Sequence, residues 1–104
     1  MQRIKSDPDW LDQICEIISE RPVYITFDVD GLDPSIMPAT GTPEPDGLSW
    51  EAATGFMREI ARNANIVGLD FVEFAPFPGG HHAAFTVAKL IYRTIGYIYC
   101  SRCD

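Results

Sequence analysis

The stretch of sequence that decides the fold is VYITFDVDG, residues 23–31. Its first five residues are β-branched or aromatic with little polar alternation, which is typical of a strand covered on both faces in a parallel sheet. Asp28 and Asp30 follow, at the strand end where open α/β sheets place their ligand sites. Because side chains two residues apart on a strand share a face, we expect the two carboxylates to converge. Two close anions favour a cation between them, and a hard divalent metal is the natural occupant.

Working outward, the patterns predict alternating helices and strands. Helical spacing of apolar residues, ended by Pro22, predicts the first helix, and a second apolar run ending at Glu73 predicts a second buried strand. The expected elements are helix 9–20, strand 23–28, loop 31–47, helix 49–63, strand 66–72 and helix 83–97. This order predicts an α/β domain with two parallel strands joined by a right-handed crossover.

Composition limits the function classes. The chain has 104 residues, 46% of them apolar, and a formal net charge of −7, so we expect one globular domain that binds neither nucleic acid nor an anionic membrane. No apolar run approaches the ~20 residues of a membrane span, and the first residues are too polar for a signal peptide. An odd number of cysteines indicates a reducing, cytoplasmic compartment. Cys100 and Cys103 have the spacing of half a zinc site, which we interpret as a chance feature.

Two longer motifs resemble those of the ureohydrolases, the arginase and agmatinase family. The first is FDVDGLDP at 27–34, continued by PATGTPEP at 38–45 and GLS at 47–49. The second is GLDFVEFAP at 68–76, which is similar to the later strand-and-glutamate motif of the family. The resemblance covers about residues 22–98. It implies a three-layer α/β/α sandwich with a mostly parallel sheet, of which this chain holds the C-terminal part.

The resemblance also implies a site and a reaction. Asp28 and Asp30 match two metal ligands of a site for two Mn²⁺ ions, Glu73 matches the carboxylate that pairs with a guanidinium group, and Thr42 matches a residue of the substrate pocket. The implied reaction is hydrolysis of a small cationic guanidino compound, agmatine foremost, to urea and an amine by a hydroxide that bridges the two ions. The implied assembly is a homo-oligomer, or an association with the missing N-terminal part.

The chain departs from the family pattern in its ligand set. The upstream motifs Gly-Gly-Asp-His and Asp-Ala-His-x-Asp do not occur in it, and in the family they supply the other ligands and a histidine that is a candidate proton donor. No catalytic residue is therefore assigned, and we expect the chain alone to hold an incomplete site. His81 and His82 are interpreted as exposed residues rather than replacement ligands, Glu44 as a loop carboxylate and Asp33 as a turn cap.

Two alternatives stay open at this point. One is a catalytically inactive ureohydrolase fragment that acts as an interaction module, because a short sheet leaves strand edges exposed. The other rests on residues 27–32, which also resemble the opening motif of haloacid-dehalogenase-type phosphatases. In those enzymes the first aspartate is a nucleophile and the second an acid/base, but Leu32 stands where they usually have threonine.

Overall fold

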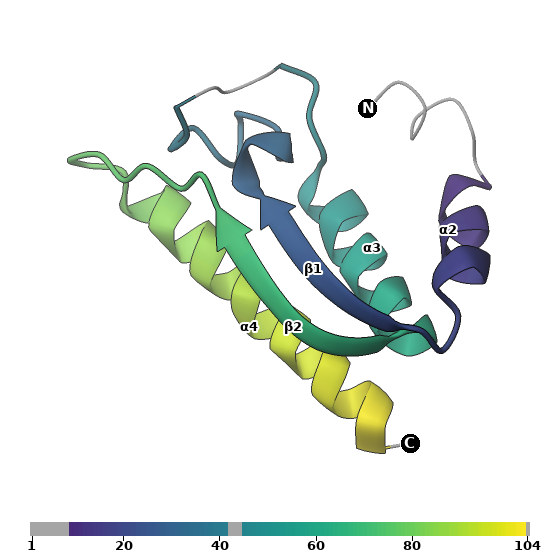
Figure 1. Ribbon diagram of the computed structural model, residues 1–104. Coiled ribbons are helices and arrows are strands. Elements are labelled where there is room, and N and C mark those ends of the chain that lie inside the picture. Colours follow the sequence, from purple (N-terminus) through teal and green to yellow (C-terminus); the bar gives the residue numbers. More distant parts are fainter. Residues whose placement is uncertain (1–8, 42–44, 104) are drawn as a thin grey trace.

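The computed structural model describes residues 9–41 and 45–103. Helices and strands alternate along the chain in the expected order (Figure 1). The elements are α2 (Trp10–Ile18), β1 (Pro22–Asp28), the 3-10 turn η1 (Val29–Gly31), α3 (Trp50–Asn63), β2 (Asn65–Val72) and α4 (His81–Cys103). No helix in the described part of the chain is long and apolar enough to cross a membrane.

The two strands pair in parallel, with Pro22 opposite Asn65 at one end and Asp28 opposite Val72 at the other. The register shifts by one residue near the start, where Val67 bulges out of the ladder. Gly68 lies against the ring of Tyr24, and a Cβ atom there would come within 2.7 Å of that ring. Because the strands end in register, the residues that follow them meet at one carboxyl edge.

The core lies between the sheet and one layer of helices. Both α3 and α4 pack against the same face of the sheet, and α2 lies beside α3 (Figure 1). The strands contribute Ile25, Phe27 and Ile66 to this core, and the helices contribute Ala53, Met57, Ile60, Ala83, Val87 and Leu90. The Phe27 and Phe71 rings lie 5.4 Å apart on the covered face. The right-handed crossover through α3 therefore fixes which face is covered.

The opposite face of the sheet is open in the described part of the chain, so the expectation of strands covered on both faces is not met there. Tyr24 on this face is 59% exposed. Tyr24 and Thr26 donate hydrogen bonds across the strands to the two carboxylate oxygens of Asp70, at 2.8 and 2.6 Å. The open face thus carries a polar cross-strand network instead of a second apolar layer.

The ends of two helices differ from expectation. The first helix stops at Ile18 rather than residue 20, because Glu20 adopts a left-handed φ of 60° in the turn before β1. The last helix begins at His81, directly after Gly80, and runs to Cys103, whereas the apolar pattern predicted 83–97. Apolar spacing marks the packed part of a helix and does not determine the residue at which the helix begins or ends.

Candidate active site at the carboxyl edge of the sheet

Asp28 ends β1 and begins the turn that follows. Its side chain accepts a hydrogen bond from the backbone N–H of Asp30 at 3.1 Å and so caps η1. Val29, between the two aspartates, is completely buried and anchors the turn in the core. Asp28 is exposed and Asp30 half-buried, so both carboxylates lie near the surface at the carboxyl edge.

The two aspartates come together for a different reason from the one expected. Strand alternation would need β1 to continue through Asp30, but β1 ends at Asp28 and Asp30 lies inside the 3-10 turn. Desolvation by the surrounding protein atoms, and then the neighbouring Asp30 carboxylate, raise the pKa of Asp28, while the Asp30 N–H opposes this effect. The 3-10 turn therefore holds the Asp28 and Asp30 carboxylates near each other, and two neighbouring anions favour a bound cation.

Glu73 lies at the same edge. It follows Val72, the residue that pairs with Asp28, and it is exposed. Its φ of 70° is left-handed, a conformation that costs a non-glycine residue about 1–3 kcal/mol. This conformation ends β2 and turns the chain toward the loop that follows β1 and η1. There the Ala75 N–H donates a hydrogen bond to the Ala39 carbonyl at 2.7 Å.

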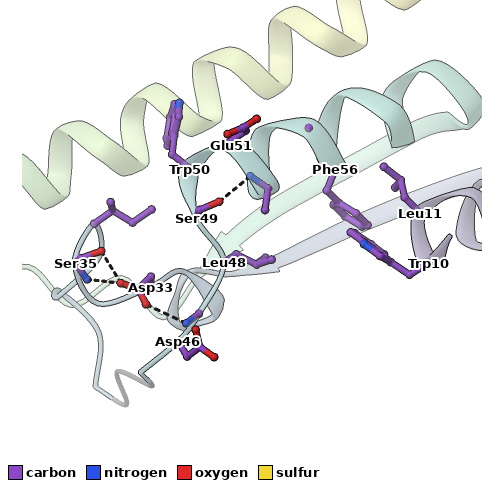
Figure 2. A pocket seen from close by; sticks show the side chains of 14 residues that line it. Trp10, Leu11, Asp33, Ser35, Asp46, Leu48, Ser49, Trp50, Glu51 and Phe56 are labelled. Carbon is purple, nitrogen blue, oxygen red and sulfur yellow. Dashed lines mark hydrogen bonds between the residues drawn. The ribbon is translucent and has the colours of Figure 1, made fainter. Parts of the chain in front are cut away.

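The loop between η1 and α3 is fixed by Asp33. One of its carboxylate oxygens accepts from the hydroxyl and backbone N–H of Ser35, and the other accepts from the N–H of Gly47 at 3.1 Å (Figure 2). The Ser35 hydroxyl, and then the Ser35 N–H, hold the pKa of Asp33 below its ordinary value. Asp33 thus closes the loop as a cap, the role that its position before a proline indicated.

A cavity of about 770 Å³ opens beside this loop but away from the carboxyl edge. It lies between α2, the first half of α3 and residues of the loop, and Figure 2 shows Asp33, Asp46 and Glu51 among its lining residues. The Trp10 and Phe56 rings stack at 5.4 Å along one wall. Asp28, Asp30 and Glu73 do not line it, so this cavity is separate from the candidate site formed by these three residues.

The other candidate residues are spread out. Thr42 and Glu44 lie outside the described residues, as does the side chain of Cys103. His81 and His82 are exposed at the start of α4, and Cys100 is a free, exposed thiol near its end. Within residues 9–41 and 45–103, no group of three or more His, Cys, Asp or Glu side chains could hold a metal ion.

Asp70 is the polar residue near this edge that sequence reasoning passed over. It lies in β2, three residues before Glu73, and ties β2 to β1 through Tyr24 and Thr26. The hydrogen bond from Thr26, and then that from Tyr24, hold the pKa of Asp70 below its ordinary value. A carboxylate at an apolar strand position was the available signal, because such a residue needs a partner across the ladder.

Comparison with known sequences identifies the family. A sequence model described as the Arginase family matches residues 1–96. This chain belongs to the arginase family. The match covers nearly the whole chain and excludes the haloacid-dehalogenase alternative, which rested on six residues.

Relatives of this arginase-family chain carry related names. The N(1)-aminopropylagmatine ureohydrolase of Synechocystis sp. is 36% identical over 96 residues, which are 92% of this chain and 31% of that protein. The same-named protein of Thermus thermophilus is 46% identical over 86 residues, 83% of this chain and 29% of that one. The agmatinase of Blochmanniella floridana is 48% identical over 66 residues, 64% and 22% of the two chains. The arginase-family chain therefore spans about a third or less of the length of these relatives.

Solved structures agree on the fold. A hypothetical agmatinase from Burkholderia thailandensis superposes with a TM-score of 0.79 at 34% identity, over 90% of this chain and 30% of that one. The arginase of Entamoeba histolytica, solved with L-ornithine, gives a TM-score of 0.70 at 29% identity, over 84% and 31%. The parallel strands and helices described above are thus an α/β portion of the arginase fold.

Proposed function

We propose that this chain supplies the carboxyl-edge residues of a manganese-dependent ureohydrolase that hydrolyses a guanidino compound, agmatine foremost, to urea and an amine. The observation that carries the proposal is the placement of Asp28, Asp30 and Glu73 at the ends of two paired parallel strands. Family membership and the names of the relatives support the reaction class.

Asp28 and Asp30 are the residues that would hold manganese. Their carboxylates are hard oxygen ligands, and a divalent cation would relieve the repulsion between two carboxylates that lie two residues apart around one tight turn. When bound, manganese supplies the Lewis acidity that makes water a nucleophile at neutral pH. Since no group of three ligands occurs among the described residues, this pair fits part of a site, and the remaining ligands must come from another segment of polypeptide.

Glu73 is the residue that would bind the substrate. An exposed carboxylate such as that of Glu73 can pair with a planar guanidinium through charge-assisted hydrogen bonds, and such a pair orients the carbon that water attacks. The net charge of −7 favours approach of a cation. Thr42 is proposed as a second pocket residue, and the proton-transferring histidine is proposed to lie in the segment that carries the other ligands.

Agmatine is the proposed substrate, with N(1)-aminopropylagmatine as the second candidate. Relatives that cover two thirds or more of this chain are named for one or the other compound. Both compounds carry the same guanidino group, so Glu73 would form the same pair with either of them. The choice between the two compounds would depend on residues that contact the end of the substrate away from the guanidino group, and these residues are not among those at the carboxyl edge of this chain.

A chimaera tests the function. The segment of the Thermus thermophilus relative that aligns over 86 residues would be replaced by the matching segment of this chain, and urea release would be measured with manganese. The substrates are agmatine, N(1)-aminopropylagmatine, arginine and 4-guanidinobutyrate. We expect urea from agmatine or N(1)-aminopropylagmatine. A folded chimaera that releases none from any of the four would contradict the proposal and favour the inactive interaction module.

The role of Glu73 is tested in the same chimaera. We expect Glu73→Gln to lower kcat/KM by about 10- to 100-fold, the effect of losing a charged hydrogen bond. Glu51→Gln is the matched control, because Glu51 is an exposed glutamate in the first turn of α3. Equal activity of both variants would remove Glu73 from the proposed site while leaving the reaction class intact.

A further inference from the structure

Asp70 on β2 holds β1 at two points. One carboxylate oxygen accepts a hydrogen bond from the Thr26 hydroxyl at 2.6 Å, and the other accepts one from the Tyr24 hydroxyl at 2.8 Å. Thr26 lies directly opposite Asp70 in the strand pairing, and Tyr24 lies two residues earlier on the same face. We call Tyr24, Thr26 and Asp70 the Asp70 clamp.

A glycine makes the bond from Tyr24 possible. Gly68 lies against the Tyr24 ring, and a Cβ atom there would come within 2.7 Å of the ring carbons Cδ2 and Cε2. Because residue 68 has no side chain, the ring can lie along β2, and its hydroxyl reaches Asp70 two residues further on. Glycine inside a strand often marks such a close approach. The glycine, the ring and the carboxylate therefore form one arrangement.

The Asp70 clamp acts where the register of the two strands needs support. The pairing shifts by one residue where Val67 bulges out of β2. A bulge disrupts the ladder locally, so the pairing before it does not determine the pairing after it. A slip by one residue would move every later side chain to the other face of the sheet. The Asp70 clamp joins the strands directly after this bulge, at the first and third residue pairs that follow it.

The carboxyl edge lies only two or three residues beyond the Asp70 clamp on each strand. Asp28 follows Thr26 by two residues on the same face of β1, about 6–7 Å along the strand. Glu73 follows Asp70 by three residues, directly after the end of β2. Because so little chain separates the clamp from the edge, a shift of β1 against β2 at the clamp would move Asp28 relative to Glu73.

We propose that Asp70 is a positioning residue of the candidate active site, because its two hydrogen bonds to β1 set the spacing between Asp28 and Glu73. The inference rests on the proposed function, in which Asp28 helps to hold manganese and Glu73 binds the guanidinium group. The attacking water and the guanidinium carbon must meet between these two residues, and a misplacement of about 1 Å can cost about a hundredfold in rate. Asp70 touches neither metal nor substrate and acts through the strands.

Steady-state kinetics of the chimaera test this role, with kcat expressed per folded, manganese-loaded enzyme. We expect Asp70→Ala to lower kcat by about 10- to 100-fold and to change KM by less than about threefold, because the substrate still pairs with Glu73 before the reaction. Thr26→Val removes one hydroxyl and should cause a smaller loss of kcat. Thr26→Ser keeps the hydroxyl and should restore kcat to within about twofold of the unsubstituted chimaera.

Two comparisons separate positioning from lost stability. The first is Ser49→Ala, which removes the N-terminal cap of α3, where the Ser49 hydroxyl accepts from the Ala52 N–H at 3.1 Å. This control should leave kcat per folded enzyme unchanged. The second combines Asp70→Ala with Glu73→Gln. There Asp70→Ala should lower kcat by at most about threefold, because the residue that it positions has already lost its charged pair.

Three outcomes would overturn the inference alone. One is equal kcat in Thr26→Val and Thr26→Ser, which decides the matter even if Asp70→Ala does not fold. Another is a loss of kcat in Ser49→Ala as large as that in Asp70→Ala, which would indicate an effect of stability. The last is full multiplication of the Asp70→Ala and Glu73→Gln effects, which would mean that the residues act independently. An unsubstituted chimaera that releases no urea would instead contradict the proposed function, and this inference with it.

Discussion

At the scale of single residues, Gly47 is a position in the loop between η1 and α3 that leaves no room for a side chain. A Cβ atom there would lie 2.7 Å from the backbone N of Asp33 and the carbonyl carbon of Leu32. We predict that Gly47→Ala destabilises the protein by about 1–3 kcal/mol, because backbone atoms must move. Gly55→Ala is the control: nothing lies within 4 Å in α3, and alanine should stabilise this helix by about 0.5–1 kcal/mol. Urea denaturation measures both, and equal effects would contradict the prediction.

Asp70 gives a prediction for pH. Its pKa is lower in the folded chain than in the unfolded chain, because Thr26 and Tyr24 donate to the carboxylate. The stabilising contribution is therefore fully present above the unfolded pKa of about 3.9 and is lost as the pH falls through the folded pKa. We predict that Asp70→Asn and Thr26→Val flatten the loss of stability as the pH falls from about 5 through the folded pKa of Asp70. Denaturation at several pH values tests this, and an unchanged slope in both variants would refute it.

Single residues also show what the sequence could predict. The aspartates after β1 were predictable candidates, because a carboxylate at the end of an apolar strand has few structural reasons to be there. Their geometry was not predictable, since it depends on a 3-10 turn held by the burial of Val29 and the N–H of Asp30. The cross-strand role of Asp70 required the register of β1 against β2. Register is a property of two segments and cannot be read from either one alone.

At the scale of elements, α3 depends on its N-terminal cap. The Ser49 hydroxyl accepts a hydrogen bond from the Ala52 N–H at 3.1 Å. We predict that Ser49→Ala destabilises the protein by about 1 kcal/mol, because one helix N–H loses its partner. Ser19→Ala, in the exposed turn after α2, is the control and should change stability by less than half as much. Thermal denaturation measures both, and an equal loss would show that Ser49 does not act as a cap.

The elements were easier to predict than the surfaces they cover. Apolar spacing located the helices and strands, since each buries one side against a common core. The open face of the sheet was not foreseen, because a run of β-branched and aromatic residues such as that in β1 indicates burial on both sides. In the described part of the chain α3 and α4 cover only one face, and Tyr24 on the other is 59% exposed. The apolar composition of β1 thus matches a strand of the complete three-layer family fold, in which both faces are covered, rather than the contacts that the strand makes within these 104 residues.

At the scale of the whole molecule, the chain spans about 30% of the length of its relatives, and in the proposed function it would carry only part of the site. Asp28, Asp30 and Glu73 share one edge, while the described residues include no third ligand for a metal beside the aspartates. Two like-charged ligands give weak binding without the others, because each ligand adds to a shared coordination shell. The central claim is that this edge is completed by ligands from another segment.

Manganese content tests that claim most directly. Purified chimaera and isolated chain would be loaded with Mn²⁺, desalted and analysed for metal. We predict two ions per subunit in the chimaera. Its Asp28→Asn variant should lose bound manganese, and its activity should fall by more than about a hundredfold, since even changes to residues beyond the ligands cost 10- to 100-fold. The control variant Asp46→Asn, at an exposed loop residue, should lose neither manganese nor activity. We predict no tightly bound ion in the isolated chain. Two tightly bound ions in the isolated chain, or full manganese in the Asp28→Asn chimaera, would contradict the account.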